Sequence, residues 1–187
     1  MTQLTDSSPE AIDAAVRAAA QAAPAWAASS GAERAALLRA LAAALEGARE
    51  QLVPMADEET GLGAGRLSGE IDRTAFQLRG FADLAERGEP FAHTDDAAMA
   101  GALTAGRPRL TRLRVPLGPV AMFRASNFPF AFSVVGGDTA AALAASCPVV
   151  FKAHPGHPRL SRAVMQLAQQ GMAAQGLPAG VQFGRGR

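Results

Sequence analysis

Hydrophobic residues recur at helical spacing through the first half of the chain. Alanine-rich sequence over residues 9–51 carries isoleucine, valine and leucine at this spacing, and a second apolar stripe runs from about 68 to 87. Such spacing places the apolar side chains on one face of a helix. Serine, proline and glutamate at residues 8–10 are typical of a helix start. We therefore predict a helical part over residues 9–90, with its charged faces in water.

Two glycine-rich stretches interrupt or follow these helices. GLGAG at 61–65 resembles part of a dinucleotide-binding motif, but no strand precedes it and no third glycine follows at the required spacing. We interpret it as a helix stop and a turn. Residues 87–108 are rich in Gly, Pro and Asp, which predicts a connecting loop.

The hydrophobic period changes in the second half. Residues 109–115 alternate between apolar and polar side chains, which predicts a partly exposed strand. Short apolar runs at 119–123 and 148–152 predict buried strands, and an apolar helix is expected between them from about 130 to 146. A further helix is expected from about 159 to 170. Strands that alternate with helices indicate right-handed β-α-β units, so the predicted fold class is α/β with parallel strands.

Composition excludes several classes of protein. The chain has 187 residues, 49% of them hydrophobic, and a formal net charge of +1. Its arginines are scattered, which argues against a nucleic-acid-binding protein. No apolar run has the length of a membrane span, and the N-terminal residues lack the apolar core of a signal peptide. The single cysteine, Cys147, cannot form an internal disulfide, so we expect a cytoplasmic protein.

Two polar residues stand at the carboxyl ends of the predicted parallel strands, or just beyond them. Asn127 lies in the run FRASNFPFAF, and Lys152 is the only lysine among 18 basic residues. Each hydrogen bond that a buried amide fails to make costs about 1–3 kcal/mol, so either a turn or a ligand must use Asn127. Ligands of such sheets bind beyond the carboxyl ends of the strands. Asn127 and Lys152 therefore mark the candidate site.

The run PLGPVAMFRASNFPFAFSVVGGDTAAALAASCPVVFKAHPGHP resembles the cofactor-binding core of the aldehyde dehydrogenase superfamily. It is similar to the NADP-using branch that contains 2,5-dioxovalerate (α-ketoglutaric semialdehyde) dehydrogenases, as is the earlier stretch EETGLGAGRLSGEIDRTAFQLRGFAD. The resemblance extends to about Val181. It implies a truncated Rossmann-like domain with an oligomerisation-arm strand at 107–116 and a βαβα nucleotide-binding half at 117–181. It also implies that the full-length protein forms a homo-oligomer.

The resemblance assigns roles to individual residues. Asn127 matches the asparagine whose amide donates to the oxyanion formed from the aldehyde, and Lys152 matches the lysine that reaches the adenosine ribose and the 2′-phosphate of NADP. Pro155 occupies a position that is acidic in many NAD-preferring relatives. We therefore expect NADP as the cofactor, with NAD as the alternative. The expected cofactor-binding residues are Phe123, Arg124, Ala125, Ser126, Lys152, His154 and Pro155.

Other polar residues leave alternatives open or carry weaker predictions. Arg124 replaces a small residue of the relatives and is expected either to obstruct the dinucleotide or to contact its phosphates. His154 and Arg159 are candidates for additional contacts to a 2′-phosphate. His154 and His157 have a His-x-x-His spacing, but the intervening Pro and Gly argue against a metal site. Cys147 is expected to be a small buried residue rather than a nucleophile.

The C-terminal residues raise a question about completeness. In the family, the catalytic cysteine, the general-base glutamate and a glycine turn at the pyrophosphate all lie beyond residue 187. The segment 182–187 reads QFGRGR, which we expect to form neither a strand nor a helix, as after a frameshift or a premature end. One hypothesis is therefore the N-terminal part of an NAD(P)-dependent aldehyde dehydrogenase, inactive by itself. The other is a non-enzymatic remnant that binds nucleotide weakly or pairs with another subunit.

Overall fold

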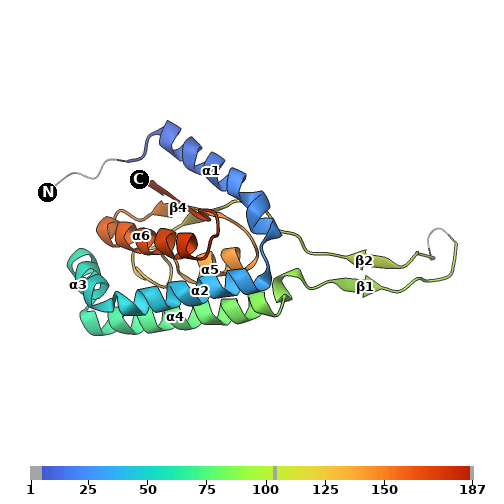
Figure 1. The fold of residues 1–187 in the computed structure, drawn as a ribbon, viewed down its shortest axis with the longest axis horizontal. Coiled ribbons are helices and arrows are strands. Elements are labelled where there is room, and N and C mark those ends of the chain that lie inside the picture. Colours follow the sequence, from blue (N-terminus) through green and yellow to red (C-terminus); the bar gives the residue numbers. More distant parts are fainter. Residues whose placement is uncertain (1–5, 103–104, 186–187) are drawn as a thin grey trace.

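The computed structural model describes residues 6–102 and 105–185. Helices make up most of the described chain, and α2 and α4 run side by side (Figure 1). The α-helices are α1 (Pro9–Ala28), α2 (Gly31–Gly47), α3 (Arg49–Thr60), α4 (Ala64–Glu86), α5 (Gly137–Ala144) and α6 (Pro158–Ala174), with one 3-10 turn, η1 (Glu89–Phe91). None of the helices in this part of the chain combines the length and apolar content needed to cross a membrane.

The predicted start of α1 and the predicted helix stop in GLGAG are confirmed, while α4 begins at Ala64, before the predicted start near residue 68. The Ser8 hydroxyl accepts a hydrogen bond from Ala11 N and caps α1. Gly61 ends α3 in the left-handed conformation, with φ +63°, where a side chain would be strained. Gly63 then precedes α4, so residues 61–63 form the expected helix stop and turn, while Ala64 and Gly65 already belong to α4.

Three parallel strands form the central sheet, in the order β3–β4–β5. Their bounds are β3 (Val120–Phe123), β4 (Val149–Ala153) and β5 (Val181–Arg185). α1 packs against β4 and β5, while α5 packs against β3 and β4. This alternation of parallel strands and helices confirms the predicted α/β class.

The expected apolar helix over 130–146 is wrong in its first half. Residues 129–136 form a series of turns, and α5 begins only at Gly137. At Gly136 the backbone is extended, and a Cβ there would lie 2.2 Å from the Ala131 carbonyl oxygen. A helix passing through this point is prevented by the close approach of the backbone, which only glycine permits.

The expected lack of secondary structure at 182–187 is also wrong, because β5 covers Val181–Arg185. Val149 N donates to Gly180 O at 2.6 Å, and the pairing continues from Val149 opposite Val181. The strand is defined by its hydrogen bonds to β4 rather than by its own side-chain pattern. Residues 186–187 lie outside the described residues.

A long antiparallel arm projects from the body (Figure 1). The strand predicted over 109–115 is shorter, β2 (Leu110–Arg112), and it pairs with β1 (Thr94–Asp96). The partner strand therefore lies within residues 87–108, which were expected to be a loop. β1 reads TDD and contains no apolar residue, so no hydrophobic period marks this largely exposed strand.

Close packing between α1 and β5 depends on a glycine. Trp26 of α1 is fully buried, and its Nε1 donates to Pro178 O at 3.2 Å. A Cβ at Gly180 would lie 2.2 Å from Cζ2 of this indole. The rigid, enclosed ring cannot move aside, so the position accepts only glycine.

We predict that Gly180→Ala lowers the free energy of unfolding by about 1–3 kcal/mol, the usual cost of overpacking a core. Gly69→Ala is the control, because a Cβ at Gly69 within α4 meets nothing within 4 Å. It is expected to raise stability by about 0.5–1 kcal/mol, since alanine favours a helix interior. Urea unfolding measures both. A Gly180→Ala protein as stable as the wild type would contradict the described contact of α1 with β5.

Candidate functional site at the carboxyl edge of the sheet

The pairing of β3 with β4 places the predicted site residues together. Phe123 lies opposite Lys152 in the parallel register, so their side chains point to the same face of the sheet. Phe123 is 79% exposed, and Lys152 is partly exposed. The sequence predicts a buried strand at 119–123, and this is wrong for the face of β3 that carries Phe123. The described helices do not cover that face at β3.

The loops that follow these two strands touch each other. His157 Nε2 lies 3.1 Å from Ala125 O, and its Nδ1 lies 3.0 Å from Ser161 Oγ. A Cβ at Gly156 would lie 3.4 Å from the Cβ of Ser126. His157 is thus a buried connector between the loops, a role that the sequence did not reveal.

Asn127 is exposed, and its carboxamide has no hydrogen-bond partner among the described residues. Its backbone oxygen accepts a hydrogen bond from Arg66 Nη2 at 2.5 Å. Buried Glu70 accepts from Phe130 N and Ala131 N, at 2.7 and 2.9 Å. The backbone around Asn127 is therefore fixed from α4, while its amide group stays free to donate to a ligand.

Arg124 does not reach the open edge. Its side chain is 0% exposed, and its guanidinium donates to Thr139 Oγ1 at 2.5 Å and lies 3.4 Å from Asp138. The guanidinium also lies over the ring of Phe151, 5.1 Å from its centroid. Burial lowers the pKa of Arg124 to about 10, against the opposing attraction of Asp138. The side chain neither obstructs the edge nor points into it, so we leave it out of the proposed cofactor contacts.

His154 and Arg159 are less available for an anion than the sequence suggested. Partial burial, His157 and Lys152 lower the pKa of His154, so it is neutral at pH 7, and its Nδ1 accepts from Gly156 N at 3.0 Å. Arg159 is paired with Glu58 and Glu59. Among the described cations at this edge, Lys152 is therefore the one without an ion pair.

The first turn of α6 is already occupied by a carboxylate. Glu59 accepts hydrogen bonds from Arg159 N and Leu160 N, both at 2.9 Å. Free N–H groups at the start of a helix attract anions. Here a side chain of α3 satisfies them, so this helix end offers no place for a phosphate.

Cys147 is buried, as predicted, and its Sγ lies 3.3 Å from Ala145 O. The described residues contain no group of three or more His, Cys, Asp or Glu side chains arranged to hold a metal ion. His154 and His157 stack with ring centroids 5.9 Å apart, and both nitrogens of His157 are engaged by protein atoms.

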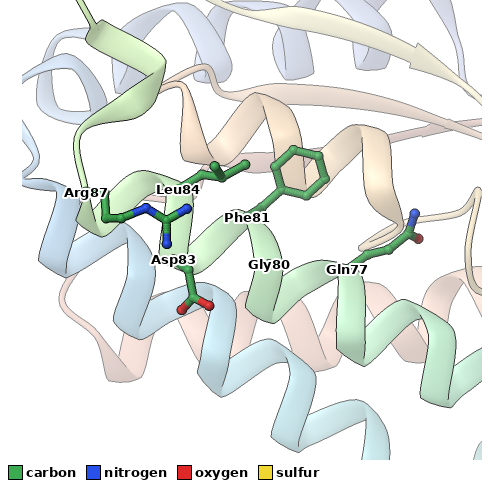
Figure 2. Close-up of a pocket in the computed structure, with 6 residues that line it drawn as sticks. All are labelled: Gln77, Gly80, Phe81, Asp83, Leu84 and Arg87. Carbon is green, nitrogen blue, oxygen red and sulfur yellow. The ribbon is translucent and has the colours of Figure 1, made fainter.

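A surface hollow of about 370 Å³ lies away from this edge. Figure 2 shows its lining along one side of α4, with Asp83 pointing away from Phe81 and Leu84. Asp83 binds Arg39 of α2. The hollow includes neither Asn127 nor Lys152, so we do not assign it to the candidate site.

The sequence model of the aldehyde dehydrogenase family matches residues 1–183. The chain belongs to the aldehyde dehydrogenase family. It is 43% identical over 143 residues to an alpha-ketoglutaric semialdehyde dehydrogenase of Acinetobacter baylyi, covering 76% of this chain and 27% of that protein. It is 45% identical over 151 residues to alpha-ketoglutaric semialdehyde dehydrogenase 2 of Azospirillum brasilense, covering 77% and 29%.

A solved aldehyde dehydrogenase of Brucella melitensis agrees with this membership, with a TM-score of 0.81 at 26% identity, over 98% of this chain and 35% of that chain. An NADP-dependent enzyme of E. coli superposes with a TM-score of 0.81 at 27% identity, over 95% of this chain and 34% of that chain. The chain thus spans between a quarter and a third of the length of the curated relatives that it matches. The expected resemblance to aldehyde dehydrogenases is confirmed.

The burial of Arg124 in this aldehyde dehydrogenase chain leads to a prediction. Arg124→Met is expected to change the free energy of unfolding by less than about 1 kcal/mol. It removes a buried cation whose Nε has no described partner, which offsets the hydrogen bond that Thr139 loses, and it leaves Asp138 largely in water. Arg124→Ala is expected to cost about 2–4 kcal/mol, since it leaves a cavity. Urea unfolding measures both. A loss in Arg124→Met as large as that in Arg124→Ala would contradict this account of the buried guanidinium.

Proposed function

We propose that this chain forms part of an NAD(P)-dependent aldehyde dehydrogenase and supplies both its oxyanion donor and an edge of its cofactor site. One observation carries the proposal: exposed Asn127 directly follows Ala125 and Ser126, the residues that contact the loop after β4, beyond the carboxyl ends of two paired strands. This is where parallel sheets bind ligands. The rest of the catalytic machinery, including a cysteine nucleophile and a glutamate base, is proposed to belong to the part of the family fold that this chain does not span.

Asn127 acts in this proposal as a neutral donor to developing negative charge. When a thiolate adds to the aldehyde carbon, the carbonyl oxygen becomes an oxyanion, and a side-chain amide that is already in place stabilises it without reorganisation. The Arg66 and Glu70 contacts hold the backbone beneath this amide. A mobile asparagine would lose much of this advantage.

The residues at the edge fit a dinucleotide that carries phosphate. Lys152 offers a compact cation at the end of β4, Ser126 offers a hydroxyl, and Pro155 places no carboxylate where one would repel a 2′-phosphate. When bound, NAD(P) supplies the hydride acceptor. We propose NADP as the preferred cofactor, a choice supported by the name of the similar E. coli enzyme.

Two further assignments rest on the relatives and on the arm. The names of the relatives support 2,5-dioxovalerate (α-ketoglutaric semialdehyde) as the aldehyde. The projecting arm, with exposed Leu110, Leu113 and Val115, is proposed to pack against another subunit of a homo-oligomer.

The first test joins residues 1–183 to the remaining part of the Azospirillum brasilense enzyme, a product called here the joined enzyme. Asn127→Ala is expected to lower its kcat by about 10²–10³-fold, the usual cost of losing one oxyanion donor. Reduction of NADP with 2,5-dioxovalerate measures it. Cys147→Ser is the control and should leave kcat unchanged, because Cys147 is buried. An unchanged kcat in Asn127→Ala would contradict the proposed role.

The second test addresses the cofactor. Lys152→Ala in the joined enzyme is expected to weaken the binding of NADP by about 1.5–3 kcal/mol, the usual contribution of a charged hydrogen bond. The binding of NAD is expected to weaken less. The KM for each cofactor measures the difference. Arg162→Ala removes the same charge from an exposed position of α6 and serves as the control. Equal weakening of both cofactors would show that Lys152 contacts only the ribose.

A further inference from the structure

Three charged side chains on one face of α4 all contact the segment that carries Asn127. Arg66, Glu70 and Arg73 follow each other at helical spacing, which aligns them along that face. Their partners lie within residues 127–132. We call these three side chains the α4 clamp.

The α4 clamp holds both the backbone and the rings of the segment. The guanidinium of Arg66 donates to Asn127 O and lies 5.1 Å from the ring centroid of Phe128. Arg73 lies 5.3 Å from the ring centroid of Phe132. The rings of Phe128 and Phe132 meet edge to face, with centroids 5.3 Å apart. Cations over aromatic faces add attraction to these contacts.

The segment cannot satisfy its own backbone. Phe132 N donates to Phe128 O and Ser133 N donates to Phe130 O, but the N–H groups of Phe130 and Ala131 turn to α4. Both donate to Oε1 of Glu70. Without this oxygen, two neighbouring buried donors would lose their acceptor, and the turns after Pro129 would lose their anchor.

Glu70 is held at a cost to stability. It is only 5% exposed, and its second oxygen, Oε2, is buried without a hydrogen-bond partner among the described residues. A buried unpaired polar atom destabilises a fold. Any stabilising contribution of Glu70 therefore comes from Oε1, which binds the backbone immediately after Asn127.

We propose that Glu70 is a positioning residue for Asn127, and that it acts by fixing the backbone from which the amide donor projects. This inference rests on the proposed function. Glu70→Gln tests it with little change of shape, because it keeps the length of the side chain but replaces a charged acceptor of two N–H groups with a neutral one.

The first measurement uses hydrogen exchange in the 187-residue chain. Glu70→Gln is expected to speed amide exchange in residues 128–133 by about tenfold, the loss of roughly one charged hydrogen bond, while α2 keeps its protection. Glu50→Gln, at an exposed position of α3, is the control and should change neither region. Unchanged protection of 128–133 in Glu70→Gln overturns the inference. Faster exchange in α2 as well as in residues 128–133 also overturns the inference, because Glu70 would then support the whole fold.

The second measurement is a double-mutant cycle in the joined enzyme. Glu70→Gln is expected to lower kcat by about tenfold with little change in the KM for NADP, and to have no further effect once Asn127 is alanine. A fall of equal size in both backgrounds overturns the inference, since Glu70 would then act independently of Asn127. If Asn127→Ala alone has no effect, the proposed function fails instead. If the joined enzyme is inactive, the exchange measurement decides.

Discussion

The candidate site depends on the parallel hydrogen bonding of β4 to its neighbours. Pairing with β3 places Phe123 beside Lys152, and pairing with β5 gives the sheet its second edge. Parallel strands end at the same side of a sheet, so residues distant in sequence meet in one pair of loops. A shift of one residue in this register would turn the Lys152 side chain to the opposite face.

The helices position the site by packing more than by charge. Ion pairs join α2 to α4, as between Arg39 and Asp83 and between Glu46 and Arg79, but they are substantially exposed. Such pairs contribute little individually. The buried leucines and alanines between α2 and α4 make α4 a firm support, and the same helix then presents Glu70 to the segment after Asn127.

Much of the fold and part of the site could be predicted from local sequence. Helical period and caps are properties of neighbouring residues, so the sequence predicts α1, α4 and α6. The strand ends also indicate Asn127 and Lys152, whose roles in the site stay a prediction. The late start of α5 depends on the close approach of Gly136 to the Ala131 carbonyl, which no hydrophobic period marks, and the existence of β5 depends on pairing with the distant β4. Glu70 was missed for the same reason, because it bonds to residues 60 and 61 positions away. The inward turn of Arg124 likewise depends on Asp138, Thr139 and Phe151.

The carboxylate of Glu59 at the first turn of α6 has a consequence for how the proposed cofactor preference of this chain can change. Because that helix end is already neutralised, anion recognition in the proposed site falls to Lys152 near the end of β4 and to Ser126 in the loop after β3. Lys152, Ser126 and the neighbouring Pro155 lie at the surface or near it, while buried His157 holds the two loops together. Cofactor preference can therefore change during evolution through one or two loop substitutions, while the sheet and its helices stay as they are.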